Sequence, residues 1–122
     1  NPGCYQLMIH LPRTSLIQVG RLGRVRFPAG FYVYTGSAMR GLNSRLKRHH
    51  SKHKRLHWHI DYLLQKSKII QTLTFEGQHQ VECELNRQVF NLDKATVIIP
   101  GFGSSDCKCR THLAYFTQPP GI

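Results

Sequence analysis

A basic stretch at residues 40–55 is the part of this sequence whose chemistry is plainest. It contains no acidic residue, while the whole chain has 17 Lys and Arg against 6 Asp and Glu and a formal net charge of +11. Such a stretch neutralises phosphates whatever the base sequence, so binding should weaken as salt rises. We therefore expect a nucleic acid partner. The candidate contacts are Arg40, Arg45, Lys47, Arg48, His49, Lys52, Lys54 and Arg55.

The same charge could instead serve an anionic membrane surface, or it could belong to an ordinary solvated helix face. Solvated faces normally mix both signs of charge, and residues 40–55 do not. No apolar run approaches the ~18–20 residues of a membrane span. We therefore expect no membrane partner.

A second pattern in the sequence could bind a metal ion. Cys107, Cys109 and His112 form a C-x-C-x-x-H motif. Structural zinc sites usually have four ligands at C-x2-C type spacing, and Cys83 could be the fourth ligand only if the fold brings it there. We therefore favour ordinary thiols over zinc. The chain's 4 cysteines are too sparse for a disulfide framework, which favours the reducing cytoplasm, or the nucleoid of a prokaryote.

Hydrophobic periodicity predicts the elements that position these residues. Period-two alternation and β-branched or aromatic residues predict strands in the first third of the chain, which should form an antiparallel sheet with tight turns at 12–15, 20–23 and 28–30. The strands are expected at 5–11, 16–19, 24–27, 31–36, 68–75 and 96–99, with a last short element at 112–116. Apolar residues three and four positions apart predict helices at 42–49, 57–66 and 80–90.

This element order predicts the α+β class, with strands first and helices after. We expect a small, mainly antiparallel sheet flanked by helices. Residues 1–117 should form one domain and residues 118–122 a tail.

Two tripeptides, Gly3-Cys4-Tyr5 and Tyr34-Thr35-Gly36, resemble the paired triplets of the GIY-YIG nuclease superfamily. Gly41-Leu42-Asn43-Ser44-Arg45-Leu46 resembles the superfamily's glycine and arginine-bearing helix, and Glu82 stands where the superfamily has its metal-binding glutamate. The blocks at 31–38, 57–63, 82–83 and 101–113 resemble a little-characterised branch that occurs alone or fused to endonuclease III-like glycosylases. The two triplets are farther apart than in the superfamily's usual hairpin, which implies extra strand between them.

The resemblance implies an endonuclease that uses Mg²⁺ or Mn²⁺ to hydrolyse phosphodiester bonds in DNA, with a place in DNA repair. Its catalytic residues would be Tyr5, Tyr34, Arg45 and Glu82. Tyr5 can act as a base only if nearby cations favour its phenolate. Arg45 would contact the scissile phosphate through its planar fork. Glu82, preferred to Glu84, would hold the metal ion.

Three further residues are expected to support this site. Gly36 would permit close backbone approach. His57 and His59 flank Trp58 and could serve as a proton shuttle or as metal ligands, although a partly buried pair that supports Asp61 is the favoured interpretation.

Two further functions remain open for this sequence. The domain could keep this fold and bind nucleic acid without cutting it. Alternatively, Cys107, Cys109 and His112 could build a zinc-held interaction module.

Overall fold

The computed structural model describes residues 1–77 and 81–122, and it has the α+β architecture that the sequence predicts. Its centre is a five-stranded sheet in which all paired strands are antiparallel. In spatial order the strands are β5 (Lys68–Glu76), β1 (Gly3–Leu11), β4 (Gly30–Ala38), β7 (Leu113–Phe116) and β6 (Thr96–Val97).

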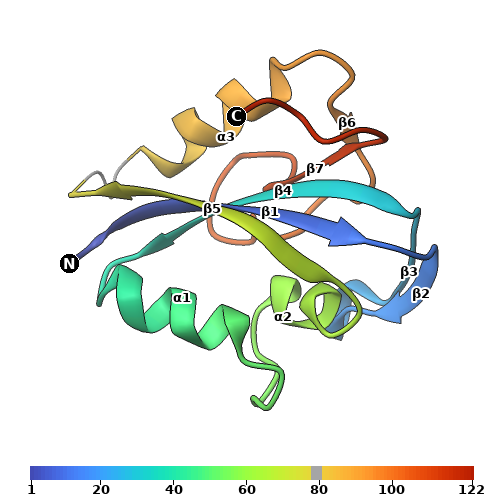
Figure 1. Cartoon of the computed structure of the whole chain (residues 1–122), viewed down its shortest axis with the longest axis horizontal. Helices are drawn as coiled ribbons and strands as arrows, with labels where there is room; N and C mark the ends of the chain where they lie inside the picture. The colour runs from blue at the N-terminus through green and yellow to red at the C-terminus, as the bar shows by residue number, and fades with distance from the viewer. Residues whose placement is uncertain (78–80) are drawn as a thin grey trace.

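Helices cover both faces of this sheet (Figure 1). Helices α1 (Leu42–His50) and α2 (His59–Leu64) lie on one face, and α3 (Glu82–Phe90) lies on the other. Because side chains alternate along a strand, Leu7 and Ile9 of β1 join the core under α1 and α2. Gln6 points the other way and donates to the carbonyl of Leu85 in α3. Burial on both faces explains why β1 is almost continuously buried.

The first third of the chain does not form the single antiparallel sheet that the sequence predicts. The strands β2 (Ser15–Gln18) and β3 (Arg24–Phe27) pair only with each other, because β1 instead takes β4 and β5 as its two neighbours. This separate hairpin is the extra strand that was expected between the two triplets. A 3₁₀ helix, η1 (Gly20–Leu22), replaces most of the predicted turn at 20–23.

The general order of strands before helices does not hold, but the strand predicted at 68–75, after the second helix, is confirmed. β5 follows α2, and β6 and β7 follow α3. The strand predicted at 96–99 is paired only at Thr96–Val97. The helix predicted at 57–66 begins at His59, because the carboxylate of Asp61 accepts hydrogen bonds from the backbone N–H groups of His57 and Trp58. The predicted start of the third helix, residue 80, lies outside the described residues.

The functional site lies at the end of β4, beyond its pairing with β7. β4 continues to Ala38, but its pairing with β7 ends at Tyr34 and Leu113. The last residues of β4 therefore have no β7 strand beside them. The start of α3 and the loop before β7 (residues 98–112) reach this end of β4. There Glu82 contacts His112, and Gly103 contacts His59.

Candidate functional site

A pocket of about 400 Å³ lies at this end of β4. Its walls come from β4, α1, the segment before α2, the start of α3 and the loop before β7. The residues that line it are Tyr34, Gly36, Ser37, Arg45, His57, Trp58, His59, Glu82, Gly103, Ser105 and Asp106. Three of the four residues implied as catalytic, Tyr34, Arg45 and Glu82, thus share one pocket.

The fourth, Tyr5, lies directly beneath Gly36. A Cβ atom on Gly36 would stand 2.7 Å from the Cζ and Oη atoms of Tyr5 and 3.1 Å from the ring of Tyr34. No side chain fits at that position without moving a tyrosine. The absence of a side chain at Gly36 therefore allows both tyrosine rings to pack against the backbone of β4.

Both tyrosines are buried, and burial sets their acidity. Burial raises the pKa of Tyr5 to about 12, even though the nearby guanidinium of Arg45 acts in the opposite direction. Burial also raises the pKa of Tyr34 well above its usual value. Arg45 favours the phenolate as expected, but desolvation outweighs it, so both phenols are neutral in the protein as it stands.

The hydroxyl of Tyr5 is hydrogen-bonded to the imidazole of His49, with 2.7 Å between Oη and Nε2. His49 was predicted as a nucleic-acid contact, but it is only 3% exposed and lies beneath the surface of α1. Burial, followed by the charge of Lys54, lowers the pKa of His49 to about 3. The ring is therefore a neutral base beside the phenol, and its Nδ1 has no hydrogen-bond partner among the described residues.

Arg45 is held in place at the wall of the pocket. Its Nη1 donates to the carbonyl of Ser37 at 2.8 Å, and its guanidinium lies 4.1 Å from the centre of the Trp58 ring. These contacts fix the direction of the charge and leave donors for a ligand.

Other cations of the basic stretch hold the fold together. Arg48 forms a two-pronged ion pair with Asp61, at 2.8 and 2.9 Å. Lys54 donates to the carbonyls at the end of α1. A positive charge there also interacts favourably with the helix dipole. Lys52 donates to the carbonyls of Leu64 and Ser67.

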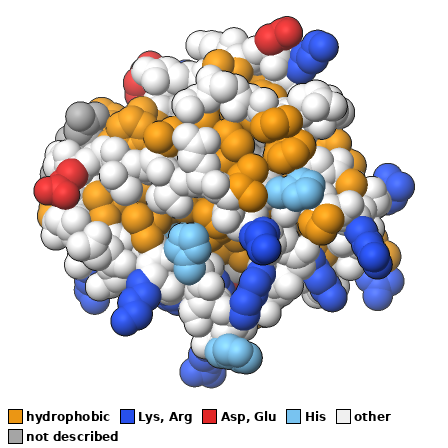
Figure 2. All heavy atoms as spheres, in the orientation of Figure 1, with side chains coloured by type: hydrophobic (Ala, Val, Ile, Leu, Met, Phe, Trp, Pro, Cys, Tyr) orange, Lys and Arg blue, Asp and Glu red, His pale blue; other side chains and the backbone are white. Residues whose placement is uncertain are grey.

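The remaining cations of the stretch, Arg40, Lys47 and Arg55, are exposed. Figure 2 shows most of the visible Lys and Arg side chains over the lower and right-hand parts of the molecule, where α1, α2, β2 and β3 lie, and the acidic side chains above them.

Glu82, not Glu84, faces the pocket. The Glu82 carboxylate lies 2.9 Å from Nδ1 of His112, whereas Glu84 is exposed and pairs with Arg87 on the outside of α3. Burial opposes the charge of Glu82, but the hydrogen bonds from His112 and Ser37 lower its pKa below the usual value. Glu82 is therefore an anion at the pocket wall.

His57 and His59 have separate roles. Nδ1 of His59 accepts the N–H of Gly103 at 2.8 Å, so this ring supports the loop before β7. His57 is exposed, and it is its backbone N–H that supports Asp61. Both line the pocket.

Sequence reasoning did not select Ser37 and Asp106 as site residues. Both line the pocket, and Asp106 is a second acidic residue among those that line it. Ser37 directly follows the second triplet, and Asp106 lies within the block at 101–113, but neither position alone reveals which way the side chain points.

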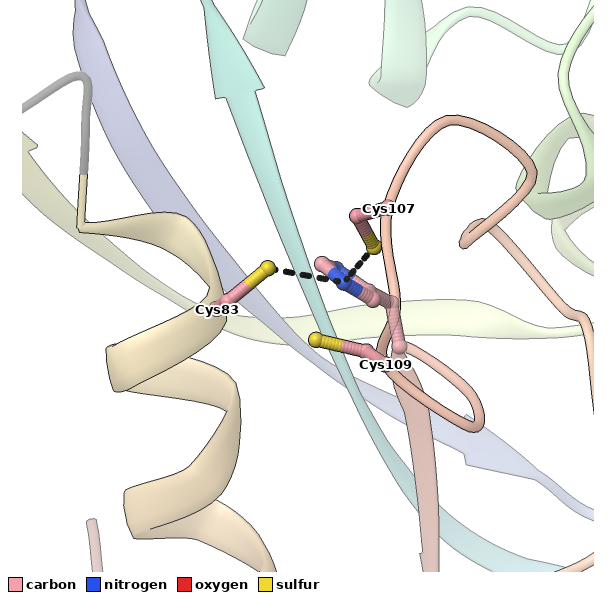
Figure 3. Close-up of side chains that lie close together, drawn as sticks. Cys83, Cys107 and Cys109 are labelled. Atoms are coloured by element: carbon pink, nitrogen blue, oxygen red, sulfur yellow. Dashed lines mark hydrogen bonds between the residues drawn. The ribbon is translucent and has the colours of Figure 1, made fainter.

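Next to this pocket the fold gathers Cys83, Cys107, Cys109 and His112 (Figure 3). Their potential ligand atoms all lie within 4.8 Å of one another. The fold thus brings in Cys83 as the fourth member that the sequence left open, and the group could hold a metal ion. Burial disfavours the charged form of His112, but the Glu82 carboxylate and the Thr35 carbonyl outweigh it and raise the pKa of His112 to about 11.

Among the described residues, no helix combines the length and the apolar character needed to cross a membrane. Neither a curated protein nor a solved structure matches the chain. One family, described as a domain of unknown function, DUF123, matches residues 4–121. Because this match spans nearly the whole sheet, the pocket and the cysteine group, the chain belongs to the DUF123 family.

Proposed function

We propose that this chain is a nuclease of the GIY-YIG superfamily that hydrolyses phosphodiester bonds in DNA with the help of Mg²⁺ or Mn²⁺. The observation that carries the proposal is the convergence of Tyr34, Arg45 and Glu82 on one pocket, with the Tyr5 phenol beneath Gly36. Branched or damaged DNA, as met in DNA repair, is the substrate class we propose.

Arg45 would bind the scissile phosphate. A guanidinium presents parallel N–H donors that match two phosphate oxygens. The Ser37 carbonyl and the Trp58 ring hold Arg45 before a substrate arrives, so less side-chain entropy is lost on binding.

The acidic residues of the pocket fit a hard divalent cation. Glu82 is ionised, and the pocket adds the carboxylate of Asp106 and the hydroxyls of Ser37 and Ser105. Mg²⁺ prefers oxygen ligands and keeps several waters, so one or two protein carboxylates suffice. Bound there, the ion would stabilise the leaving 3′ oxygen.

Tyr5 and His49 would manage the proton of the attacking water. A phenol with a pKa of about 12 is almost never a free phenolate at neutral pH. His49 offers another route, because the Tyr5 hydroxyl can pass its proton to Nε2 while its oxygen takes the proton from water. The negative charge of a bound phosphate would raise the pKa of His49 and favour this transfer.

A nicking assay tests the proposal. Supercoiled plasmid, branched duplexes and abasic duplexes are incubated with the full chain and Mg²⁺ or Mn²⁺, with a chelator as the metal-free arm. We expect nicked product that requires the metal. Arg45→Ala and Glu82→Gln should each lower the rate at least about 100-fold.

Glu84→Gln is the matched control, because it removes a carboxylate two positions from Glu82 on the outside of the same helix. It should cut as the unmodified chain does. Binding of all three DNAs without any cleavage would overturn the nuclease and leave a domain that holds nucleic acid. Cleavage that survives both Arg45→Ala and Glu82→Gln would point to a contaminating enzyme and equally defeat the proposal.

A further inference from the structure

The group formed by Cys83, Cys107, Cys109 and His112 has the dimensions of a tetrahedral metal site. Nε2 of His112 lies 3.3 Å from Sγ of Cys107 and 3.9 Å from Sγ of Cys83. In a zinc site with three sulfur ligands and one nitrogen ligand, neighbouring ligand atoms are about 3.5–3.8 Å apart. In Figure 3 the three sulfurs surround one imidazole ring, with Cys83 on α3 and the other two on the loop before β7.

We propose that these four side chains bind one zinc ion, and that His112 couples this ion to Glu82 in the neighbouring pocket. The zinc site stands on its own geometry, whereas its consequence for catalysis rests on the proposed function.

The chemistry of the donors favours zinc over a hard cation. Three sulfurs and an imidazole suit zinc, whereas Mg²⁺ and Ca²⁺ take oxygen ligands. Three thiolates and Zn²⁺ leave one net negative charge, which nearby cations can balance. Arg87, Lys108 and Arg110 line the same hollow of about 390 Å³ as Cys83 and Cys109.

The two ring nitrogens of His112 face different sites. Nε2 points to the sulfurs, while Nδ1 lies 2.9 Å from Oε2 of Glu82 and 3.0 Å from the carbonyl of Thr35. With Nε2 on zinc, Nδ1 carries the hydrogen and donates it to Glu82 or Thr35. A carboxylate in this position orients a metal-bound histidine and strengthens it as a ligand.

The same contacts tie the pocket wall together. Cys83 follows Glu82 directly in α3, while Cys107 belongs to the loop that contributes Gly103 and Asp106 to the pocket. An ion shared by helix and loop would hold both segments at fixed separation. Zinc would thus be structural, and Glu82 would be positioned by it through His112.

Metal analysis of the full chain, purified with a thiol reductant, tests the site. We expect one zinc per chain, and after exchange for Co²⁺ we expect the sulfur-to-cobalt charge-transfer and visible bands of a tetrahedral thiolate site. Cys109→Ser and His112→Asn should each lose the stoichiometric metal. Cys4→Ala removes a cysteine outside the group and should keep it.

If a variant fails to fold, the metal content of the unmodified chain still tests the site. Absence of both stoichiometric zinc and the cobalt bands in the unmodified chain would overturn the site, and so would a Cys83–Cys107 or Cys107–Cys109 disulfide that persists under reductant. Retention of full metal affinity in folded Cys109→Ser and His112→Asn would overturn it as well.

Zinc affinity, measured by competition with a chelating indicator, tests separately whether His112 couples the ion to Glu82. Glu82→Gln should weaken zinc binding about 10- to 100-fold, while Glu84→Gln should leave it unchanged. Equal affinities in these two variants would refute the link. Neither measurement depends on DNA cleavage, so loss of the nuclease proposal would leave the zinc result intact, and the reverse also holds.

Discussion

The hydroxyl of Tyr5 and Nε2 of His49 lie 2.7 Å apart and join the interior strand β1 to helix α1 beneath the pocket. Both side chains are almost fully buried, since Tyr5 is 1% and His49 is 3% exposed. This pair places a hydroxyl and a neutral base beneath Gly36, which lines the pocket.

Replacing either member of this pair should slow cleavage. Tyr5→Phe and His49→Gln remove the hydroxyl or the imidazole, and general acid–base catalysis contributes about 10²–10⁴-fold to a rate. We expect single-turnover cleavage to fall by at least about 100-fold in each, with DNA affinity unchanged. Tyr115→Phe is the control, because its hydroxyl donates to the carbonyl of Ala29 and its ring packs on Tyr32, outside the pocket. Equal cleavage by Tyr5→Phe and Tyr115→Phe would remove Tyr5 from the mechanism.

Gly36→Ala should destabilise the protein and impair the pocket together. The added Cβ would meet Tyr5 at 2.7 Å and Tyr34 at 3.1 Å, and overpacking of this kind costs about 1–3 kcal/mol. Thermal unfolding followed by circular dichroism should show a lower Tm, and nicking should be slower at a temperature where the variant is folded. Gly121→Ala, which has open space around its Cβ, should behave as the unmodified chain does. An unchanged Tm in Gly36→Ala would contradict this packing of Gly36 against the two tyrosines.

Asp61 should make stability depend on pH. Burial raises its pKa, but the hydrogen bonds from Arg48 and from the amides of His57 and Trp58 outweigh burial and hold the pKa below its ordinary value. A carboxyl whose pKa is lower in the folded state stabilises the fold above its unfolded pKa of about 4, and this contribution disappears as the pH falls through the folded value. Urea unfolding should therefore give a falling midpoint below about pH 4.

Asp61→Asn should cost about 3 kcal/mol at pH 7, because it leaves Arg48 without its anion and weakens two backbone hydrogen bonds. The difference in stability between the variant and the unmodified chain should shrink as the pH falls through the folded pKa of Asp61. Below that pH the Asp61 carboxyl is protonated, so position 61 is uncharged in both proteins. Asp93→Asn, at an exposed site, is the control and should change little at either pH. A difference that stays constant from pH 7 into the acid range would show that the charge of Asp61 is not what stabilises the fold.

The exposed cations of the basic stretch should govern the salt dependence of DNA binding. Each phosphate contact that is lost should reduce the slope of log affinity against log salt by about 1. We expect this reduction for Arg40→Ala and Lys47→Ala in fluorescence anisotropy titrations at several salt concentrations. Arg13→Ala removes a charge that is also exposed, in the turn between β1 and β2, and is the control.

Arg48 and Lys54 should respond differently from those two. Their donors are already bonded to Asp61 and to carbonyls of α1, so substitution by alanine should lower stability more than it lowers DNA affinity. If Arg48→Ala instead keeps full stability, the division of the stretch into exposed and structural cations is wrong.

The sequence by itself determined the local elements of this protein. Alternation of apolar and polar residues placed β1 and β3 within two residues of their observed ends, and aromatic and β-branched residues did the same for β4. The spacing of apolar residues predicted helix α1. These features depend on neighbours a few positions apart, which a linear pattern records directly.

Only the tertiary structure decided which distant residues meet. Glu82 and Glu84 are indistinguishable as helix residues, but their side chains point in different directions, and the packing of α3 turns only Glu82 toward His112. Cys83 joins Cys107 and Cys109 because pairing of β4 with β7 stops at Tyr34, so that α3 and the loop before β7 meet at that edge. The side chain of His49 is buried because its partner Tyr5 lies on the face of β1 that α1 covers. Sheet order and helix packing fix these distances, and periodicity along the chain carries no information about either.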